Sequence, residues 1–171
     1  DVCAIVHPSA AAIPLVAYGA TLEITSAKGK REQPLETFFV HPREDVLREN
    51  SLGAGEMITS IHVPLPRAGT KAAYLKQGEK ESFDWPLADV AAVLEMSGST
   101  VRKASIVLGA AAAVPRRVAG AEKYLAGKRL DEATAREAAR IAMEGATPLA
   151  NNGYKVPMFE AVIARALMRA T

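Results

Sequence analysis

The sequence has a single cysteine, Cys3, among its 171 residues. An internal disulfide is therefore impossible, which fits a reducing compartment such as the cytoplasm. A lone cysteine is most often inert core filler. The alternative is a ligand to a metal cluster whose other ligands lie upstream, and composition leaves both interpretations of Cys3 open.

The sequence also lacks a strong charge bias and a long apolar run. Its formal net charge is +2, which gives no electrostatic basis for a nucleic-acid partner or a polybasic membrane surface. No apolar stretch reaches the roughly 18 to 20 residues that a membrane-spanning helix requires. With 49% hydrophobic and 23% charged residues, the composition is that of a globular protein.

The common short catalytic motifs are missing as well. Serine, histidine and aspartate occur, but none stands in a G-x-S-x-G or H-E-x-x-H frame, and there is no P-loop. The three histidines, His7, His41 and His62, are scattered along the chain. We interpret them as solvated or strand-face residues, so the sequence favours neither a hydrolase nor a zinc enzyme.

The start of the chain has none of the marks of a signal peptide. It begins at Asp1 without a methionine, and it has neither a basic segment nor a cleavage-like tail. We therefore expect the sequence to be the C-terminal part of a longer polypeptide.

Hydrophobic periodicity and turn residues divide the chain into strands followed by helices. The predicted elements, in chain order, are a helix over 10–18, a strand over 20–26, a strand end and helical turn over 31–39, a strand over 55–63, strands over 71–77, 88–98 and 99–111, and helices over 118–126, 131–145 and 157–170. This order favours an α+β fold, in which the last three strands form a three-stranded antiparallel sheet packed with three helices.

A charged loop interrupts two strands in "YLKQGEKESFDWPLADVAAVLEM", residues 74–96. Lys76 ends the first strand with apolar residues behind it. Its ammonium group is either solvated or directed at a carbonyl or phosphate group of a ligand. Phe83 and Trp85 precede the second strand, either as an anchor of the loop to the core or as a wall beside a ligand, and we favour the anchor.

A second loop, "NNGYK" at residues 151–155, joins two predicted helices. Asparagine and glycine suit turns with positive φ. The loop is either a plain connection between the helices or a surface that docks onto a partner subunit.

Four segments, taken in order, resemble the FAD-binding (medium) subunits of the molybdenum hydroxylase family. They are "LGAGEMITSIHVPLP", "AAYLKQGEKESFDWPLADVAAVLEM", "IVLGAAAAVPRRVAGAEKYLAGKRL" and "ATPLANNGYKVPMFEAVIARALMRA". Their order and spacing, rather than any single motif, carry the resemblance over essentially the whole chain. The family includes xanthine dehydrogenase and carbon monoxide dehydrogenase, and this chain looks most like the bacterial aldehyde oxidoreductase and 4-hydroxybenzoyl-CoA reductase types.

The resemblance implies a division into residues 1–66, the end (second subdomain) of an FAD-binding domain, and residues 67–171, a flavoprotein C-terminal α+β domain. It implies an FAD-carrying subunit of an oxidoreductase that passes electrons between iron-sulfur centres and an acceptor such as NAD. The implied partners are a molybdenum-binding large subunit and a [2Fe-2S] small subunit, in a heterotrimer or its dimer.

Two further expectations follow from the same resemblance. The location is expected to be cytoplasmic, or periplasmic through the export signal of a partner subunit. The alternative function is a non-catalytic module that docks subunits together and binds no FAD in isolation.

The resemblance also assigns site residues. A lysine at the position of Lys76 approaches the flavin in relatives, and Ile58 stands where an apolar residue lies near the ring. Relatives carry an aspartate that contacts FAD where this chain has Ala10, which leaves Ser9 as the hydrogen-bonding residue of that segment. The loop after the lysine is also less basic here than in relatives. No residue is expected to be a general acid or base for the substrate reaction.

Cys3 acquires a possible role from this comparison. In the aldehyde oxidoreductase and 4-hydroxybenzoyl-CoA reductase branches, an inserted loop carries a [4Fe-4S] cluster. Cys3 stands where the last cysteine of that loop is found, so it is expected to be the fourth ligand of a cluster whose other three thiolates lie upstream.

Overall fold

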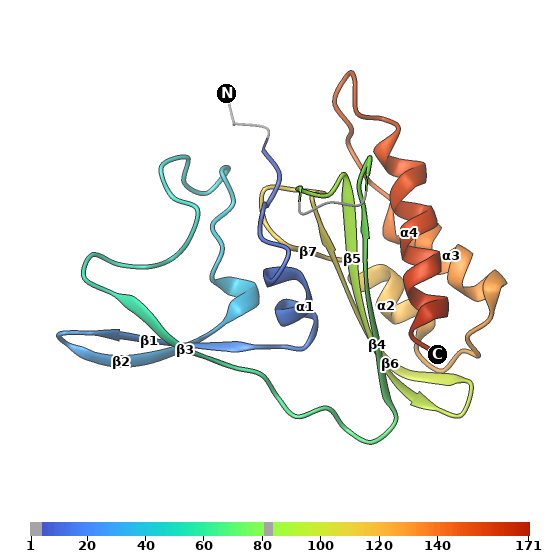
Figure 1. The fold of residues 1–171 in the computed structure, drawn as a ribbon, viewed down its shortest axis with the longest axis horizontal. Helices are drawn as coiled ribbons and strands as arrows, with labels where there is room; N and C mark the ends of the chain where they lie inside the picture. Colours follow the sequence, from blue (N-terminus) through green and yellow to red (C-terminus); the bar gives the residue numbers. More distant parts are fainter. Residues whose placement is uncertain (1–4, 81–83) are drawn as a thin grey trace.

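The computed structural model describes residues 5–80 and 84–171 of the chain (Figure 1). Two antiparallel sheets form its framework, one in each half of the chain. The first has the strand order β2-β1-β3 and the second the order β4-β5-β6-β7. The predicted α+β class is confirmed, and the three predicted strands of the second sheet are joined by a short edge strand, β7.

The elements of the first half are α1 (Ala12–Ala17), β1 (Thr21–Ser26), β2 (Gly29–Pro34), the 3-10 helix η1 (Leu35–Thr37) and β3 (Met57–His62). Those of the second half are β4 (Thr70–Gln77), β5 (Ala88–Ser97), β6 (Thr100–Gly109), β7 (Arg116–Arg117), α2 (Ala119–Leu125), α3 (Glu132–Ala142) and α4 (Lys155–Arg169).

The helix boundaries follow local hydrogen bonds. Asp131 caps α3 as the sequence predicts, since its Oδ1 accepts the N–H of Thr134 at 2.8 Å. Helix α4 begins two residues before Pro157, the predicted first residue of this helix. Proline is tolerated in the first turn of a helix because the N–H groups of that turn have no intrahelical partner. Within the described residues, no helix is long and apolar enough to cross a membrane.

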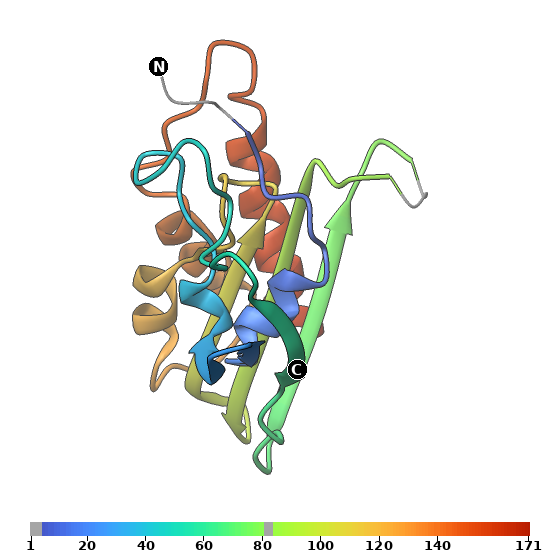
Figure 2. The same cartoon turned by 90° about the vertical axis from the view of Figure 1, so that its left-hand side faces the viewer.

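The second sheet is covered on both faces. Figure 1 shows α1 on one side of it and α3 and α4 on the other, and Figure 2 shows the same layers turned by 90°. The core on the side of α2–α4 includes Val90, Leu94, Ile106, Phe159 and Ile163. The core on the side of α1 includes Ile13, Val16, Leu22 and Ile24 together with Ala91 and Val107 of the second sheet.

Burial on both faces explains the composition of β5. Successive side chains of a strand point to opposite faces, and a strand covered on both sides becomes a nearly continuous apolar run. Val90 and Ala92 belong to the core beside α2–α4, whereas Ala91 belongs to the core beside α1. Asp89 is the one charged residue among residues 88–94 of β5, and it is only 1% exposed.

Arg117, on the edge strand β7, ties the two halves of the chain together. Its Nη1 donates to Ser105 Oγ at 2.8 Å and to Glu122 Oε1 at 3.0 Å, both in the second half. Its Nε donates to Glu36 Oε1 at 2.7 Å, and its Nη2 donates to the Val16 carbonyl at 3.2 Å, both in the first half. One half-buried guanidinium therefore serves four acceptors from both halves.

We predict that Arg117→Ala lowers the free energy of unfolding of the chain by about 2 kcal/mol, because the substitution removes three part-buried hydrogen bonds and leaves the part-buried Glu122 carboxylate without its ion-pair partner. The matched control is Arg136→Ala, which removes an exposed pair with Glu132 on α3 and is expected to cost less than about 0.5 kcal/mol. Urea unfolding measures both, and equal losses would contradict the role given to Arg117.

Candidate functional site

A row of polar residues crosses the second sheet near the charged loop, at the end where β4 finishes. Lys76 of β4 stands directly opposite Asp89 of β5, and Asp89 stands opposite Gly109 of β6. Residues directly opposite each other point to the same face of a sheet. Tyr74, two residues before Lys76, shares that face, and its hydroxyl donates to Asp89 Oδ2 at 3.0 Å.

The Asp89 carboxylate lies against the backbone of β6. A Cβ atom added to Gly109 would come within 2.3 Å of Asp89 Oδ1, so only glycine leaves room for the carboxylate at this position. Burial raises the pKa of Asp89, while the Tyr74 hydrogen bond and the charges of Lys76 and Lys155 act in the opposite direction. Burial and the neighbouring Asp89 charge also raise the pKa of Tyr74.

Lys155, at the start of α4, is the second cation that acts on Asp89. Its Nζ donates to the Ala110 carbonyl at 2.5 Å, and burial lowers its pKa. Ala110 has a φ of 55°, in the left-handed region that non-glycine residues seldom adopt. The chain thus turns sharply after Gly109, at Ala110, whose carbonyl accepts the hydrogen bond from Lys155.

The loop after β4 folds back over Lys76. Lys76 Nζ donates to the Asp84 carbonyl, and Lys80 Nζ lies 3.6 Å from Asp84 Oδ2. With Trp85 and other loop residues, these groups line a cavity of about 120 Å³. The Lys76 ammonium is therefore held at the wall of a small cavity.

Trp85 does not anchor this loop. Its side chain is 77% exposed, so the preferred interpretation from the sequence is wrong for Trp85. Phe83, its predicted companion, lies outside the described residues. The exposed indole instead forms part of the cavity wall beside Lys76.

The structure does not gather the predicted site residues into one cavity. Ile58 pairs with Ile24 of β1 and packs, half-buried, against the core beside α1. Ser9 Oγ accepts the N–H of Ala12 at 3.3 Å, at the start of α1. The cavity beside Lys76 is lined by a predicted site residue, whereas two larger cavities among the described residues are not.

Cys3, the predicted cluster ligand, lies outside the described residues. Within the part of the chain that the structure describes, no group of three or more His, Cys, Asp or Glu side chains is placed to hold a metal ion. His7, four residues after Cys3, has a buried Nε2 for which the structure gives no hydrogen-bond partner. Burial lowers the pKa of this histidine.

Sequence reasoning missed Tyr74 and Asp89. The available signal was a single carboxylate inside the apolar run "ADVAAVL", since a charge in a doubly covered strand must have partners. Tyr74 gave no such signal, because its contact with Asp89 depends on the register between β4 and β5.

Comparisons with known proteins match the two halves of the chain to two family models. The model of the CO dehydrogenase flavoprotein C-terminal domain matches residues 73–170. The chain belongs to this family. A second model, the FAD binding domain in molybdopterin dehydrogenase, matches residues 1–66. The resemblance to the medium subunits of the molybdenum hydroxylases is confirmed.

Individual relatives of the flavoprotein family agree with this assignment. The chain is 28% identical over 171 residues to the aldehyde oxidoreductase FAD-binding subunit PaoB of Escherichia coli K12, covering 99% of this chain and 50% of that protein. It is 31% identical over 157 residues to the carbon monoxide dehydrogenase medium chain of Afipia carboxidovorans, covering 89% and 52%. The chain thus spans about half the length of these relatives.

Solved structures of the family share the fold. Quinoline 2-oxidoreductase from Pseudomonas putida 86 matches with a TM-score of 0.84 and 26% identity, over 98% of this chain and 57% of that one. Carbon monoxide dehydrogenase from Hydrogenophaga pseudoflava matches with a TM-score of 0.83 and 29% identity, over 93% and 55%.

We predict that the buried carboxylate makes stability depend on pH. Because burial raises the pKa of Asp89, the folded chain keeps a proton on this group at pH values where the unfolded chain, with a pKa of about 4, has lost it. The retained proton stabilises the folded chain. Its contribution to the free energy of unfolding is complete below the pKa of Asp89 in the unfolded chain, and it is lost as pH rises to the pKa of Asp89 in the folded chain. Asp89→Asn removes this titration. The free energy of unfolding of the variant, relative to wild type, should therefore rise over the pH window between the unfolded and the folded pKa of Asp89 and then level off.

Urea unfolding of both proteins between pH 4 and pH 8 measures this difference. Tyr74→Phe supplies the matched test, because it removes the hydrogen bond that lowers the pKa of Asp89, so the window should extend to higher pH. A stability difference that stays flat over the whole range would contradict the assignment.

Proposed function

We propose that the chain is part of the FAD-carrying electron-transfer subunit of a molybdenum hydroxylase. The observation that carries the proposal is the tandem match of both halves, 1–66 and 73–170, to the two flavoprotein families. The names of PaoB and of the carbon monoxide dehydrogenase medium chain support it. The boundary near residue 66 is proposed to divide the end of the FAD-binding domain from the C-terminal domain.

The residues beside Lys76 fit one edge of a flavin. The cavity there is about 120 Å³, which is well below the roughly 300 to 1,000 Å³ of a typical small-molecule pocket. This part of the chain therefore forms one side of an FAD-binding site rather than the whole site. An ammonium group beside an exposed indole suits the polar edge and the flat face of an isoalloxazine ring.

Bound FAD supplies one- and two-electron transfer between redox partners. The chain's own residues position and tune it. The Lys76 ammonium donates hydrogen bonds to an acceptor on the ring and favours added negative charge nearby. Ile58 provides apolar contact from β3, and Ser9 retains a hydroxyl proton for donation while its oxygen accepts the Ala12 N–H.

The same proposal extends to the assembly. A molybdenum-binding large subunit and a [2Fe-2S] small subunit are the proposed partners, with NAD or another acceptor receiving the electrons. Cys3 is proposed as the fourth ligand of a [4Fe-4S] cluster in the full-length protein. These roles rest on the family resemblance, and the chain itself spans only about half the length of its relatives.

The rival function is a subunit-docking module that binds no FAD by itself. The absorption spectrum of the purified chain separates the two functions. A yellow protein with a flavin spectrum supports cofactor binding. A colourless protein that still binds the large and small subunits supports docking.

We predict that Lys76→Met in the full-length subunit, within its complex, lowers the two-electron midpoint potential of bound FAD by about 30 mV or more. The reason is the loss of a positive charge that favours reduction, and 30 mV corresponds to about 1.4 kcal/mol for two electrons. Spectroelectrochemical titration of the flavin measures the potential.

The matched control is Lys71→Met, which removes the same charge from an exposed position on the same strand, β4. Because successive side chains of a strand point to opposite faces, Lys71 lies on the opposite face of β4 from Lys76. A potential that shifts equally in both variants, or in neither, would sink the role of Lys76 without affecting the family assignment.

A further inference from the structure

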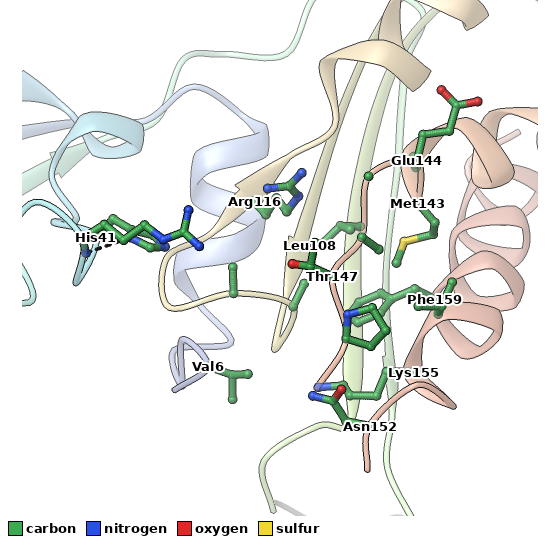
Figure 3. Close-up of a pocket in the computed structure, with 18 residues that line it drawn as sticks. Val6, His41, Leu108, Arg116, Met143, Glu144, Thr147, Asn152, Lys155 and Phe159 are labelled. Atoms are coloured by element: carbon green, nitrogen blue, oxygen red, sulfur yellow. Dashed lines mark hydrogen bonds between the residues drawn. The ribbon is translucent and has the colours of Figure 1, made fainter. Parts of the chain in front are cut away.

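A second cavity, of about 290 Å³, opens near β6 and β7 and the connection between α3 and α4. Its lining brings together His41 and Arg43, the turn after β6, Arg116 of β7, residues 142–148 and the start of α4. Figure 3 shows Leu108, Thr147 and Phe159 near its centre, with Arg116 on one side of them and Asn152 and Lys155 on another. Lys76, Ile58 and Ser9 do not line it.

The charges on this cavity are unbalanced. Arg43, Arg116 and Lys155 contribute three positive charges, and Glu144 is the only acidic residue of the lining. The Glu144 side chain points away from the centre of the cavity in Figure 3. Among the described residues, neither Arg43 nor Arg116 forms an ion pair, whereas Glu144 is paired with Arg140 of α3 at 3.0 Å.

The position of Arg116 follows from strand geometry. Arg117 turns its guanidinium to the α1 side of the sheet, where it bonds the Val16 carbonyl. Alternation along β7 directs its neighbour Arg116 to the other side, toward the cavity. Lys155 spends one N–H on the Ala110 carbonyl, and an ammonium group has two more to offer a ligand.

The floor of the cavity is apolar. Leu108 is 1% exposed and Phe159 is 2% exposed, and Met143 and Pro148 add to the lining. The volume of about 290 Å³ lies just below the roughly 300 to 1,000 Å³ found for small-molecule sites. A ligand of this site therefore combines a small apolar body with an anionic group.

We propose that this cavity binds a small organic phosphate. Three cations opposed by one carboxylate leave a net charge of +2, which complements a phosphate dianion better than a carboxylate. Guanidinium groups bind phosphate through paired N–H donors, and Arg43 and Arg116 come from separate segments that can hold it from two sides. The phosphate is bound by these cations, and the organic group lies over Leu108 and Phe159. This inference is independent of the proposed flavin site.

Isothermal titration of the full-length subunit, saturated with FAD, tests the proposal with phenyl phosphate as the probe. Phenyl phosphate carries one phosphate on one ring and is not a fragment of FAD. We expect saturable binding that weakens with added salt. Inorganic phosphate lacks the apolar body, and benzoate carries a single charge. Each should bind at least about tenfold more weakly than phenyl phosphate.

Variants locate the binding. Arg116→Gln and Arg43→Gln should each raise the dissociation constant of phenyl phosphate about tenfold, the loss expected for one charge-assisted contact. Both side chains are exposed, so the fold is retained. Arg102→Gln is the matched control: it removes the same charge from an exposed residue near the opposite end of β6, and should leave binding unchanged.

Three outcomes would overturn the inference. The first is no saturable binding of phenyl phosphate at millimolar concentration. The second is equal weakening by Arg102→Gln and Arg116→Gln, which would mean non-specific attraction to a basic protein. The third is benzoate binding as tightly as phenyl phosphate, which would assign the cavity to carboxylates. Neither the flavin content nor the potential measured for Lys76→Met enters this test.

Discussion

The architecture depends on Arg117, a half-buried arginine at the edge of the second sheet. Its four hydrogen bonds join the end of α1 and η1 to β6 and α2. These bonds hold α1 against one face of the second sheet. The guanidinium has enough donors in fixed directions to serve all four acceptors, which a lysine could not do. Apolar packing of Ile13 and Val16 against Ala91 and Val107 supplies the area, and Arg117 fixes the orientation.

Covering the sheet on both faces has a chemical consequence at one end of it. A polar group at position 89 of β5 cannot reach bulk water, so the Asp89 carboxylate must be accommodated by its neighbours. Glycine at 109 makes room for the carboxylate, Tyr74 donates to it, and lysines at 76 and 155 offset its charge. The strand pairing that sets Asp89 between β4 and Gly109 also sets Lys76 opposite it, beside the loop cavity. The burial of the carboxylate and the placement of this cation are consequences of the same pairing.

The sequence predicted the order of elements because each one carries its own local signal, such as the alternation in β3 and the Asp131 cap of α3. It could not predict that α1 covers the second sheet, since this depends on a contact between residues about 90 positions apart, such as Ser105 Oγ with the Ala17 carbonyl. The pattern left Lys76 either solvated or directed at a ligand, and the choice of the ligand-directed interpretation came from the resemblance. Asp89 was missed because the pattern of β5 showed an apolar run without showing which face each residue occupies, and the exposure of Trp85 depends on a loop whose path no periodicity encodes.

Lys155 connects the two sites electrostatically. It lines the cavity with Arg43 and Arg116, and it is also one of the two lysines whose charge favours ionised Asp89. Burial works against its charge, and an anion in the cavity would work in its favour. A phosphate bound there would therefore stabilise the positive charge of Lys155, which also acts on Asp89. The coupling passes through one side chain and needs no movement of the backbone, because Lys155 already touches the turn at Ala110 that follows Gly109.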